Sequence, residues 1–511
     1  MLPTLLPRLY LGTMTWGWSQ ASSPCPLPVA VEFLDSFMAS PCTSPPYLVD
    51  TARIYAGGAT EPIVGGVVAN FDSKSTSASA SASTAVLVGT KCNPAASGGL
   101  SPSGIESQIA ASLEALQATK VGEFYLHQPD PNADLLDSLR ALSALHKAGT
   151  ISSIGMSNYH SSEVARAFSL CAQHKLVKPS VYQGIYSPLN RLVEADLLPI
   201  LRENGCSFVA YNPLAAGLLS GKHSGEGDVP SGRFSENQNY LPRFYTDANF
   251  AAVDDIRRAC AAEGLPMVEA TFRWLLAGSA LAPTDGVLLG ASSVAQLEEN
   301  LAGCDAARVK GRLPESVQSV MDGVFEKYTA DSAFKYWRGF SRDHPGREGM
   351  DQGANYEAGK KGEKGSSGSS DSRSRMISEI GSGAGDDDDL GDASTKVVLS
   401  RGCDPVMAQK AGAMLPPLLG NAQIESCTSD ADFFSKLATK KYDAVFFAPG
   451  ACRFSAAGAP IPGAVAASKG WTLEEYRAFV REKQGEDVKI VETTEERNIV
   501  PLLREALGLK K

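Results

Sequence analysis

"FYLHQPDPNADLLDSLRALSALHKAGTISSIGMS" (residues 124–157) decides the predicted fold. Its two ends, residues 124–128 and 151–157, are short apolar runs of the kind that form β-strands. Between them, residues 133–149 repeat their leucines at helical spacing. A strand, a helix and a second strand in this order predict two parallel strands joined by a helical crossover.

The same alternation continues through the first part of the chain. Short apolar runs predict strands over residues 8–14, 47–52, 85–91, 124–128, 151–157, 180–186, 207–213 and 286–292. Helical periodicity between them predicts helices over residues 29–39, 60–71, 104–117, 133–149, 161–175, 193–205, 250–264 and 268–278. After the last strand, "SVAQLEENLAG" predicts a helix that begins after Ser293 as N-cap and ends at Gly303.

Eight strand–helix units match the count and the usual length of a (β/α)8 TIM barrel. An open doubly wound sheet would need fewer units and usually carries G-x-G-x-x-G after its first strand, a motif that this sequence lacks. We therefore predict a TIM barrel over residues 1–341.

The remainder of the chain divides by composition. Residues 71–85 are a Ser/Ala run and predict a flexible insertion. Residues 342–395 are rich in Gly, Ser and charge and predict a disordered linker. Residues 396–511 resume strand–helix alternation and predict a small α/β domain of flavodoxin-like type. Two of its predicted loops carry Cys403 and Cys452, which leaves a disulfide switch, a small anion site or two ordinary thiols open.

The composition of the chain limits the classes of molecule that it is expected to bind. The net charge of −10 argues against nucleic acid and anionic membrane surfaces, which reward a basic face, and favours a small molecule or a protein. Ten cysteines without a C-x-x-C pair suit a reducing compartment. We find no signal peptide and no apolar run long enough to span a membrane, so we expect a cytoplasmic protein, with a homo-oligomer left open.

Four polar side chains fall at the ends of successive predicted strands, where TIM barrels place their catalytic groups. Tyr55 could donate a proton to a carbonyl oxygen, although an ordinary phenol has a pKa of about 10. A neighbouring Lys91 would lower that pKa, and Asp50 would hold the lysine charged. His127, as a neutral donor, could align the carbonyl. Taken singly, each residue could equally be a cap, a solvated charge or a core histidine.

The segments "LGTMTWG", "DTARIYAGGATEPIVGG", "VGTK", "YLHQPD", "GMSNY", "VYQGIYSPLNR" and "LLGASSVAQLEENL" resemble the aldo-keto reductases. "VAYNPLAAGLLSGK" with "SGRF" resembles their aflatoxin-aldehyde reductase subfamily. The resemblance spans roughly residues 6–340 and implies NADPH-dependent reduction of aldehydes and ketones to alcohols without a metal. It makes Tyr55 the general acid and Asp50, Lys91 and His127 the rest of a catalytic tetrad, with His127 also contacting substrate.

The resemblance also implies a cofactor site across the barrel mouth. Ser157, Asn158 and Gln183 would hold the carboxamide, and Tyr186 would stack on the nicotinamide ring. The pyrophosphate loop would contribute Asn212, Pro213, Leu214, Gly217, Leu219 and Lys222. Arg233 would bind the 2′-phosphate. The adenosine end of the cofactor would be lined by Gly290, Ser292, Gln296, Glu299 and Asn300. Tyr186 could equally be barrel packing, and Gln296 and Glu299 solvated helix positions.

Arg338, in "KYWRGF", corresponds to a C-terminal feature of the subfamily and could reach a substrate carboxylate, or could be an exposed arginine. The first loop, "WGWSQASSPCPLP", and the Ser/Ala run depart from the family pattern, so the natural substrate stays open. A reductase-like regulatory subunit that senses nicotinamide state is the alternative to an enzyme. The retained tetrad favours catalysis.

Overall fold

A computed structural model of the chain describes residues 6–18, 25–74, 86–223, 241–354, 392–402, 412, 415–447, 471–492 and 499–509. The chain divides into two compact units, Met1–Glu363 and Lys364–Lys511. The first unit contains a closed barrel and the second a four-stranded sheet. Most of the predicted Ser/Ala insertion and of the predicted linker lies outside the described residues.

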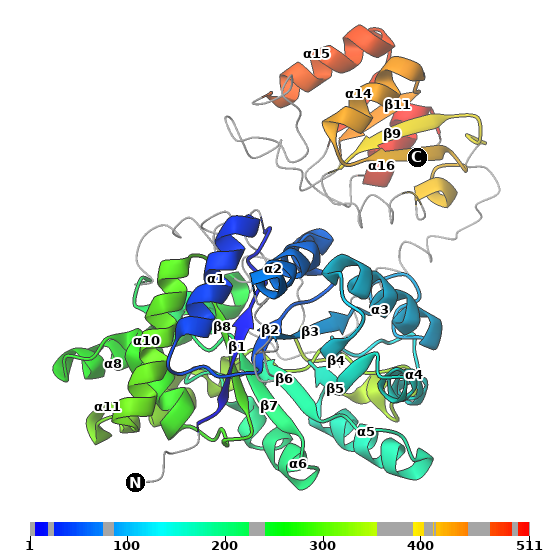
Figure 1. Ribbon diagram of the computed structural model, residues 1–511. Coiled ribbons are helices and arrows are strands. Elements are labelled where there is room, and N and C mark those ends of the chain that lie inside the picture. The colour runs from blue at the N-terminus through cyan, green and yellow to red at the C-terminus, as the bar shows by residue number, and fades with distance from the viewer. Residues whose placement is uncertain are drawn as a thin grey trace. The chain divides into compact units, whose positions relative to one another are not determined.

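The first unit confirms the predicted TIM barrel. Eight parallel strands pair in chain order, and β1 closes the ring against β8 (Figure 1). The strands are β1 (Arg8–Gly12), β2 (Tyr47–Asp50), β3 (Val86–Cys92), β4 (Val121–Leu126), β5 (Ile151–Ser157), β6 (Val181–Ile185), β7 (Ser207–Tyr211) and β8 (Gly286–Gly290). Their carboxyl ends therefore meet at one mouth, where polar side chains can converge.

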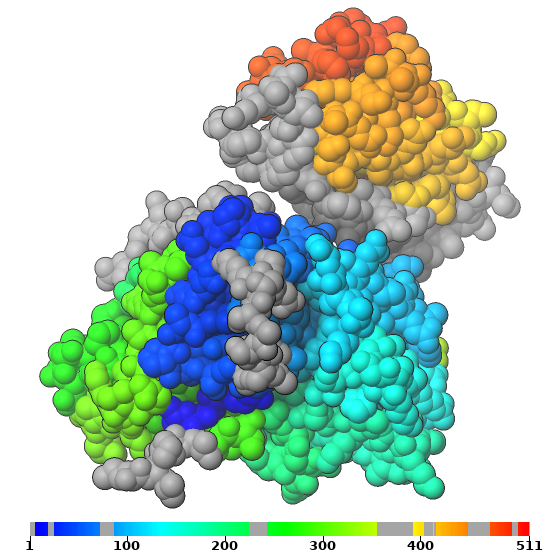
Figure 2. Space-filling model, viewed as in Figure 1, coloured from blue at the N-terminus to red at the C-terminus, as the bar shows by residue number. Residues whose placement is uncertain are grey.

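Helices surround the strands of the barrel (Figure 1). They are α1 (Leu27–Ala39), α2 (Thr60–Lys74), α3 (Pro102–Leu116), α4 (Leu135–Lys147), α5 (Ser161–His174), α6 (Leu197–Glu203), α7 (Leu241–Phe244), α8 (Asp247–Ala262), α9 (Met267–Arg273), α10 (Val294–Lys310) and α11 (Glu315–Val324). The space-filling view from the same side shows α1 in blue and α10 and α11 in green at the surface of the barrel (Figure 2). Among the described helices, none is both long and apolar enough to cross a membrane.

Side chains at alternate strand positions fill two separate cores. A small cluster inside the barrel is distinct from the large cluster that packs the strands against the helices, and its buried members are Tyr10, Leu48, Tyr125, Val181 and Val209. Side chains two residues apart on a strand share a face. Gln183 and Tyr211, two residues beyond Val181 and Val209, therefore face the inside near the mouth.

The predicted end of the last barrel helix is wrong. Ser293 does cap α10, because its hydroxyl accepts a hydrogen bond from the Gln296 backbone, but the helix runs past Gly303 to Lys310. A Cβ at position 303 would lie 3.1 Å from the Phe272 ring and 3.3 Å from the Val268 carbonyl oxygen. The glycine thus permits close packing on α9 and does not end the helix.

The predicted start of the linker is also wrong. Residues 333–354, which we call the strap, cross from α11 to the barrel and pack against it. The Arg338 backbone amide donates to the Asn158 carbonyl, and the Ser341 amide donates to the Glu163 carboxylate. Asp343 pairs with Arg166. Residues 342–354 are therefore part of the barrel unit, although their composition is that of a linker.

The second unit holds parallel strands in the order β10-β9-β11-β12. The strands are β9 (Val397–Arg401), β10 (Gln423–Cys427), β11 (Ala444–Phe447) and β12 (Lys489–Glu492), and the helices α14 (Asp430–Thr439), α15 (Leu473–Gln484) and α16 (Ile499–Leu507). In chain order this is 2-1-3-4, as in the flavodoxin-like fold that the sequence predicted. Cys403 and Cys452, and with them the predicted thiol switch, lie outside the described residues.

Candidate active site

Asp50 and Lys91 form a buried ion pair where β2 and β3 reach the mouth. The Lys91 ammonium lies 2.7 and 2.8 Å from the two Asp50 carboxylate oxygens and donates to the Thr51 backbone carbonyl at 2.7 Å. The Gln183 amide donates to the same carboxylate from β6 at 2.8 Å. Burial lowers the pKa of Lys91, and the negative charge of Asp50 opposes that shift.

Tyr55 reaches the lysine from the loop after β2. The loop is a 3₁₀ turn whose Ala56 and Gly57 have φ of 48° and 65°, the left-handed region that a tight reversal requires. Arg53 anchors the turn through an ion pair of 2.9 Å with the fully buried Glu61 of α2. This anchoring holds the Tyr55 hydroxyl 3.3 Å from the Lys91 ammonium.

His127 follows β4 and completes the cluster. Its backbone amide donates to the Cys92 carbonyl, and its ring lies 6.1 Å from the Tyr55 ring at an interplanar angle of 78°. Burial, with smaller effects from the charges of Lys91 and Arg338, lowers the pKa of His127 well below its usual value. The imidazole is therefore neutral at physiological pH and can donate one hydrogen bond.

The contact between Lys91 and Tyr55 suits proton transfer from the phenol. An ammonium has three N–H donors, and here Asp50, the Thr51 carbonyl and the Tyr55 oxygen lie within their reach. When Lys91 donates to the Tyr55 oxygen, its positive charge favours ionisation of the phenol. The arrangement can therefore give a proton to an oxygen at the mouth and stabilise the phenolate that remains.

The predicted carboxamide residues lie together beside this cluster. All three are buried: Ser157 ends β5, Asn158 follows it, and Gln183 lies in β6. The Asn158 amide already donates to the His127 backbone carbonyl and to the Ser157 hydroxyl. Its carbonyl oxygen accepts from Tyr211 at 2.9 Å. Asn158 thus joins the ends of β4, β5 and β7 around the mouth.

The prediction that Tyr186 stacks on a nicotinamide is wrong. Its side chain has no exposed surface and stacks on Trp274 at 5.7 Å, with Phe208 edge-on at 6.0 Å. Its hydroxyl donates to Glu194 at 2.5 Å. Tyr186 therefore lies in the layer between strands and helices, where its ring has no face open to a ligand.

Tyr211 is the aromatic residue that sequence reasoning missed. It ends β7, is partly exposed and packs against the edge of the large cluster, two positions after Val209 of the interior cluster. Its hydrogen bond to Asn158 directs it to the mouth. The alternation of β7 could have identified it, because Tyr211 lies two positions after a valine that faces the barrel interior.

The remaining predicted cofactor residues form the rim after β7 and β8. Backbone in the left-handed region turns the loop at Asn212 and Gly217, and Pro213 and Leu219 are buried beneath it. The Asn300 amide donates to the Gly290 carbonyl, and Gln296 accepts from both the backbone and the hydroxyl of Ser292. Leu214 is partly exposed, Lys222 and Glu299 are exposed, and Arg233 lies outside the described residues.

Arg338 stands at the same mouth, carried there by the strap. Its guanidinium donates to the Gln128 amide oxygen at 3.1 Å, and its backbone amide bonds Asn158. Its charge contributes to the lowered pKa of His127. The structure thus brings Arg338 to the tetrad, as a residue that contacts substrate would require.

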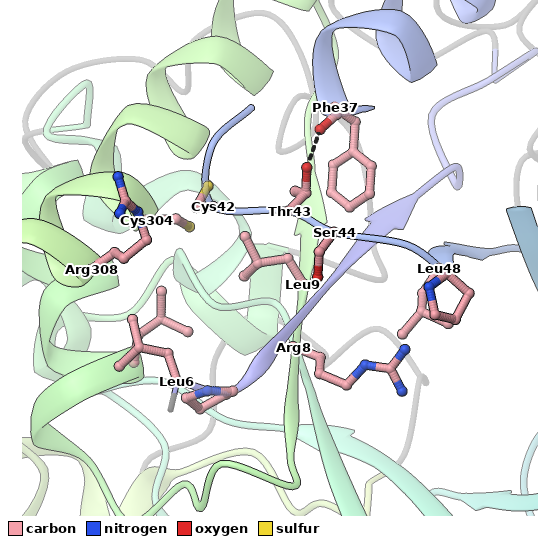
Figure 3. Close-up of a pocket in the computed structure, with 13 residues that line it drawn as sticks. Leu6, Arg8, Leu9, Phe37, Cys42, Thr43, Ser44, Leu48, Cys304 and Arg308 are labelled. Carbon is pink, nitrogen blue, oxygen red and sulfur yellow. Dashed lines mark hydrogen bonds between the residues drawn. The ribbon is translucent and has the colours of Figure 1, made fainter. Parts of the chain in front are cut away.

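A cavity of about 320 Å³ lies elsewhere, at the amino-terminal end of the barrel (Figure 3). Its lining includes Arg8 at the start of β1, Phe37 of α1, Thr43 in the loop after α1, and Cys304 and Arg308 of α10. The Thr43 hydroxyl donates to the Phe37 carbonyl at 2.6 Å within its wall. Because the tetrad lies at the carboxyl ends of the strands, this cavity is separate from the candidate active site.

Comparison with known proteins agrees with this geometry. A sequence model of the aldo/keto reductase family matches residues 8–311, from β1 to the end of α10. Aflatoxin B1 aldehyde reductase member 2 of Mus musculus is 37% identical over 330 residues, which cover 62% of this chain and 84% of that protein. Aflatoxin B1 aldehyde reductase member 4 of Homo sapiens is 36% identical over 309 residues, covering 58% and 86%. Aldo-keto reductase family 7 member A3 of Homo sapiens is 37% identical over 269 residues, covering 50% and 79%.

Proposed function

Because the chain belongs to the aldo/keto reductase family, we propose that its barrel reduces aldehydes and ketones to alcohols with NADPH, using Tyr55 as the acid. The observation that carries this proposal is the contact of the Tyr55 hydroxyl with the buried ammonium of Lys91. Relatives named as aldehyde reductases support an aldehyde as substrate.

Each residue of the tetrad has a separate role in the proposed proton transfer. NADPH, when bound, supplies the hydride. Tyr55 gives its proton to the carbonyl oxygen, and the Lys91 ammonium stabilises the phenolate that is left. Neutral His127 donates a hydrogen bond that orients the carbonyl, because its lowered pKa keeps it uncharged. Asp50 keeps the lysine charged in its buried position.

The mouth has suitable groups for the cofactor. Hydroxyl and amide side chains at Ser157 and Gln183 suit a carboxamide, since they can both donate and accept hydrogen bonds. Tyr211, which is partly exposed and bonded to Asn158, is the aromatic residue that we propose in the role expected of Tyr186. The amino-terminus of α10, beside Ser292, suits a phosphate. These features support NADPH as the ligand of this face.

Replacing Tyr55 with Phe tests the proposal. We expect Tyr55→Phe to lower kcat for NADPH oxidation with a panel of aldehydes by about 100-fold or more, because the acid is lost while the ring remains. Cofactor affinity, measured by fluorescence titration, should stay unchanged. A wild-type chain that binds NADPH but turns over no aldehyde would instead support the regulatory-subunit alternative.

The position of Arg338 at the mouth supports a substrate aldehyde that also carries a carboxylate. This part of the proposal can be tested separately. We expect Arg338→Met to raise KM for a carboxylate-bearing semialdehyde by about tenfold, the usual effect of a lost charged hydrogen bond. The KM for a neutral aldehyde of similar size should not change, and this pair of substrates is the control. An equal rise for both substrates would show that Arg338 only supports the fold.

A further inference from the structure

A second polar cluster lies inside the barrel, below the tetrad. Glu123 of β4 accepts hydrogen bonds from Tyr10 of β1 at 2.9 Å and from Tyr125 at 2.5 Å. Glu123, Tyr125 and His127 alternate along one chain segment, so all three face the barrel interior. Glu123 is partly exposed, whereas Tyr10 and Tyr125 are buried. We call Tyr10, Glu123 and Tyr125 the interior triad.

Glycines on neighbouring strands make room for the triad. A Cβ at Gly155 would lie 2.3 Å from the Tyr125 ring, and one at Gly286 would lie 2.5 Å from the Tyr10 ring. A Cβ at Gly89 would meet Glu123 at 3.3 Å. Real Cβ atoms do not approach to the first two distances. The barrel is therefore built around these three side chains.

The triad lies next to the catalytic lysine. Lys91 and Tyr125 are direct partners in the pairing of β3 with β4, and the Lys91 ammonium lies 5.7 Å from the centre of the Tyr125 ring. The Tyr125 ring therefore lies near the ammonium, and its hydroxyl donates to the Glu123 carboxylate.

Burial and the charges on the surrounding strands shift the pKa values of Glu123 and Lys91. Burial raises the pKa of Glu123, while hydrogen bonds from Tyr125 and Tyr10 lower it, as does Arg8 of β1. Asp50 of β2 raises it further. For Lys91, burial lowers the pKa, and the carboxylates of Asp50, Glu123 and Glu61 oppose that shift. The two phenol donors and its partial exposure favour the carboxylate form of Glu123 and oppose the effect of burial on its pKa.

We propose that Glu123 is a positioning residue for the reaction, which acts through Tyr125 to keep Lys91 charged beneath Tyr55. This inference rests on the proposed function. A purely structural triad would fill the barrel but would leave the titration of Lys91 and Tyr55 unaffected. The two roles therefore differ in the pH dependence of the protein.

The test is the alkaline limb of the pH profile of kcat for aldehyde reduction. Removing a negative charge makes both the Lys91 ammonium and the Tyr55 phenol easier to deprotonate. We expect Glu123→Gln to move the loss of activity to lower pH by roughly 0.5–1 pH unit, the effect of one charge at this range in a protein interior. An unmoved limb overturns the proposal.

Tyr10→Phe is the matched control. It removes one hydrogen bond of the triad but keeps the ring, and it leaves Glu123 charged at alkaline pH. Its limb should coincide with that of the wild type, and an equal shift in both variants would overturn the proposal. If Glu123→Gln does not fold, the variant Tyr10→Phe/Glu123→Met/Tyr125→Phe replaces the whole triad with apolar side chains and should show the same shift.

A second measurement does not depend on turnover. The ultraviolet absorbance of phenolate, taken as the difference between each chain and its Tyr55→Phe counterpart, reports the ionisation of Tyr55 directly. We expect this titration to move down in Glu123→Gln as the kinetic limb does. A wild type without turnover would refute the proposed function, yet this titration would still show whether Glu123 acts on Tyr55 and Lys91.

Discussion

At the scale of single residues, Asp50 and Lys91 have side chains only 3% and 0% exposed. Two opposite charges in such a place stabilise each other, but each alone would be costly. We expect Asp50→Asn to lower the free energy of unfolding by about 3–5 kcal/mol, because the ammonium loses its only anionic hydrogen-bond partner among the described residues. Urea denaturation measures the loss.

The double variant Asp50→Asn/Lys91→Met separates the charge from the packing. It removes the uncompensated ammonium and keeps a side chain of similar length. We expect it to be at least about 2 kcal/mol more stable than Asp50→Asn alone, although inactive. A double variant no more stable than the single one would show that the pair is stabilised mainly by other contacts.

Tyr211 and Tyr186 offer a contrast at the same scale. We expect Tyr211→Leu to weaken NADPH binding by about three- to tenfold, the value of one aromatic stack. Tyr186→Leu should leave that affinity unchanged and lower the stability, because it removes contacts with Trp274 and leaves Glu194 without the phenol donor. Fluorescence titration with NADPH and urea denaturation of both variants decide the matter, and the reverse pattern would restore Tyr186 as the stacking residue.

Among the elements, the strap introduces a pH dependence through Glu163 in the first turn of α5. Burial raises the pKa of Glu163 from 4.5 to about 7, although the Ser341 amide donates to its carboxylate. The folded protein therefore favours the protonated form. The contribution of protonated Glu163 to the free energy of unfolding is fully present below pH 4.5. It is lost as the pH rises through 7, because the folded protein must then bury a carboxylate.

The variant Glu163→Gln should lack this dependence. Between pH 4.5 and 8, we expect the free energy of unfolding of the wild type to fall by up to about 3 kcal/mol relative to the variant. Urea denaturation of the two chains across this range measures the difference. Parallel pH profiles would show that Glu163 titrates normally, and that the strap is held chiefly by other contacts such as Asp343 with Arg166.

The strap also explains what the sequence could not predict at this scale. Each barrel strand carries its own signal, so the eight strands were predicted to within a few residues. Residues 342–354 have no such signal, because their order comes from contacts with distant residues such as Arg166 and Asp134. Likewise, α10 passes Gly303 because of its packing on α9, which no local propensity reveals.

Over the whole molecule, the division into two units allows a truncation experiment. We expect residues 1–363 to fold and to reduce aldehydes as the full chain does, because the tetrad and the strap lie in this unit. Loss of turnover in this fragment, at unchanged thermal stability, would show that residues 364–511 contribute to the reaction.

A shorter fragment, residues 1–332, is the matched control because it also lacks the strap. Its unfolding free energy should be lower by roughly 5 kcal/mol or more, since burial of Tyr336, Trp337 and Phe340 is lost. It should also lose Arg338 from the mouth. A fragment as stable as residues 1–363 would contradict the strap's role in the fold.

At this scale the sequence predicted the architecture better than the chemistry of the site. Repetition of one strand–helix unit predicted the barrel, and the same pattern predicted the small sheet, whose strand order is 2-1-3-4. The convergence of Asp50, Tyr55, Lys91 and His127 could be predicted because these residues lie at the ends of successive strands. The interior triad could not be recognised without register, since a tyrosine or glutamate in a strand faces either side with equal ease.

The glycines around the interior triad constrain how this barrel can change. At position 155 any larger residue would overlap the Tyr125 ring, and at position 286 it would overlap the Tyr10 ring. The aromatic side chain must therefore be lost before its glycine can be replaced. Each glycine and its tyrosine therefore form an ordered pair of substitutions, because the opposite order passes through a protein in which the new side chain and the ring compete for the same space.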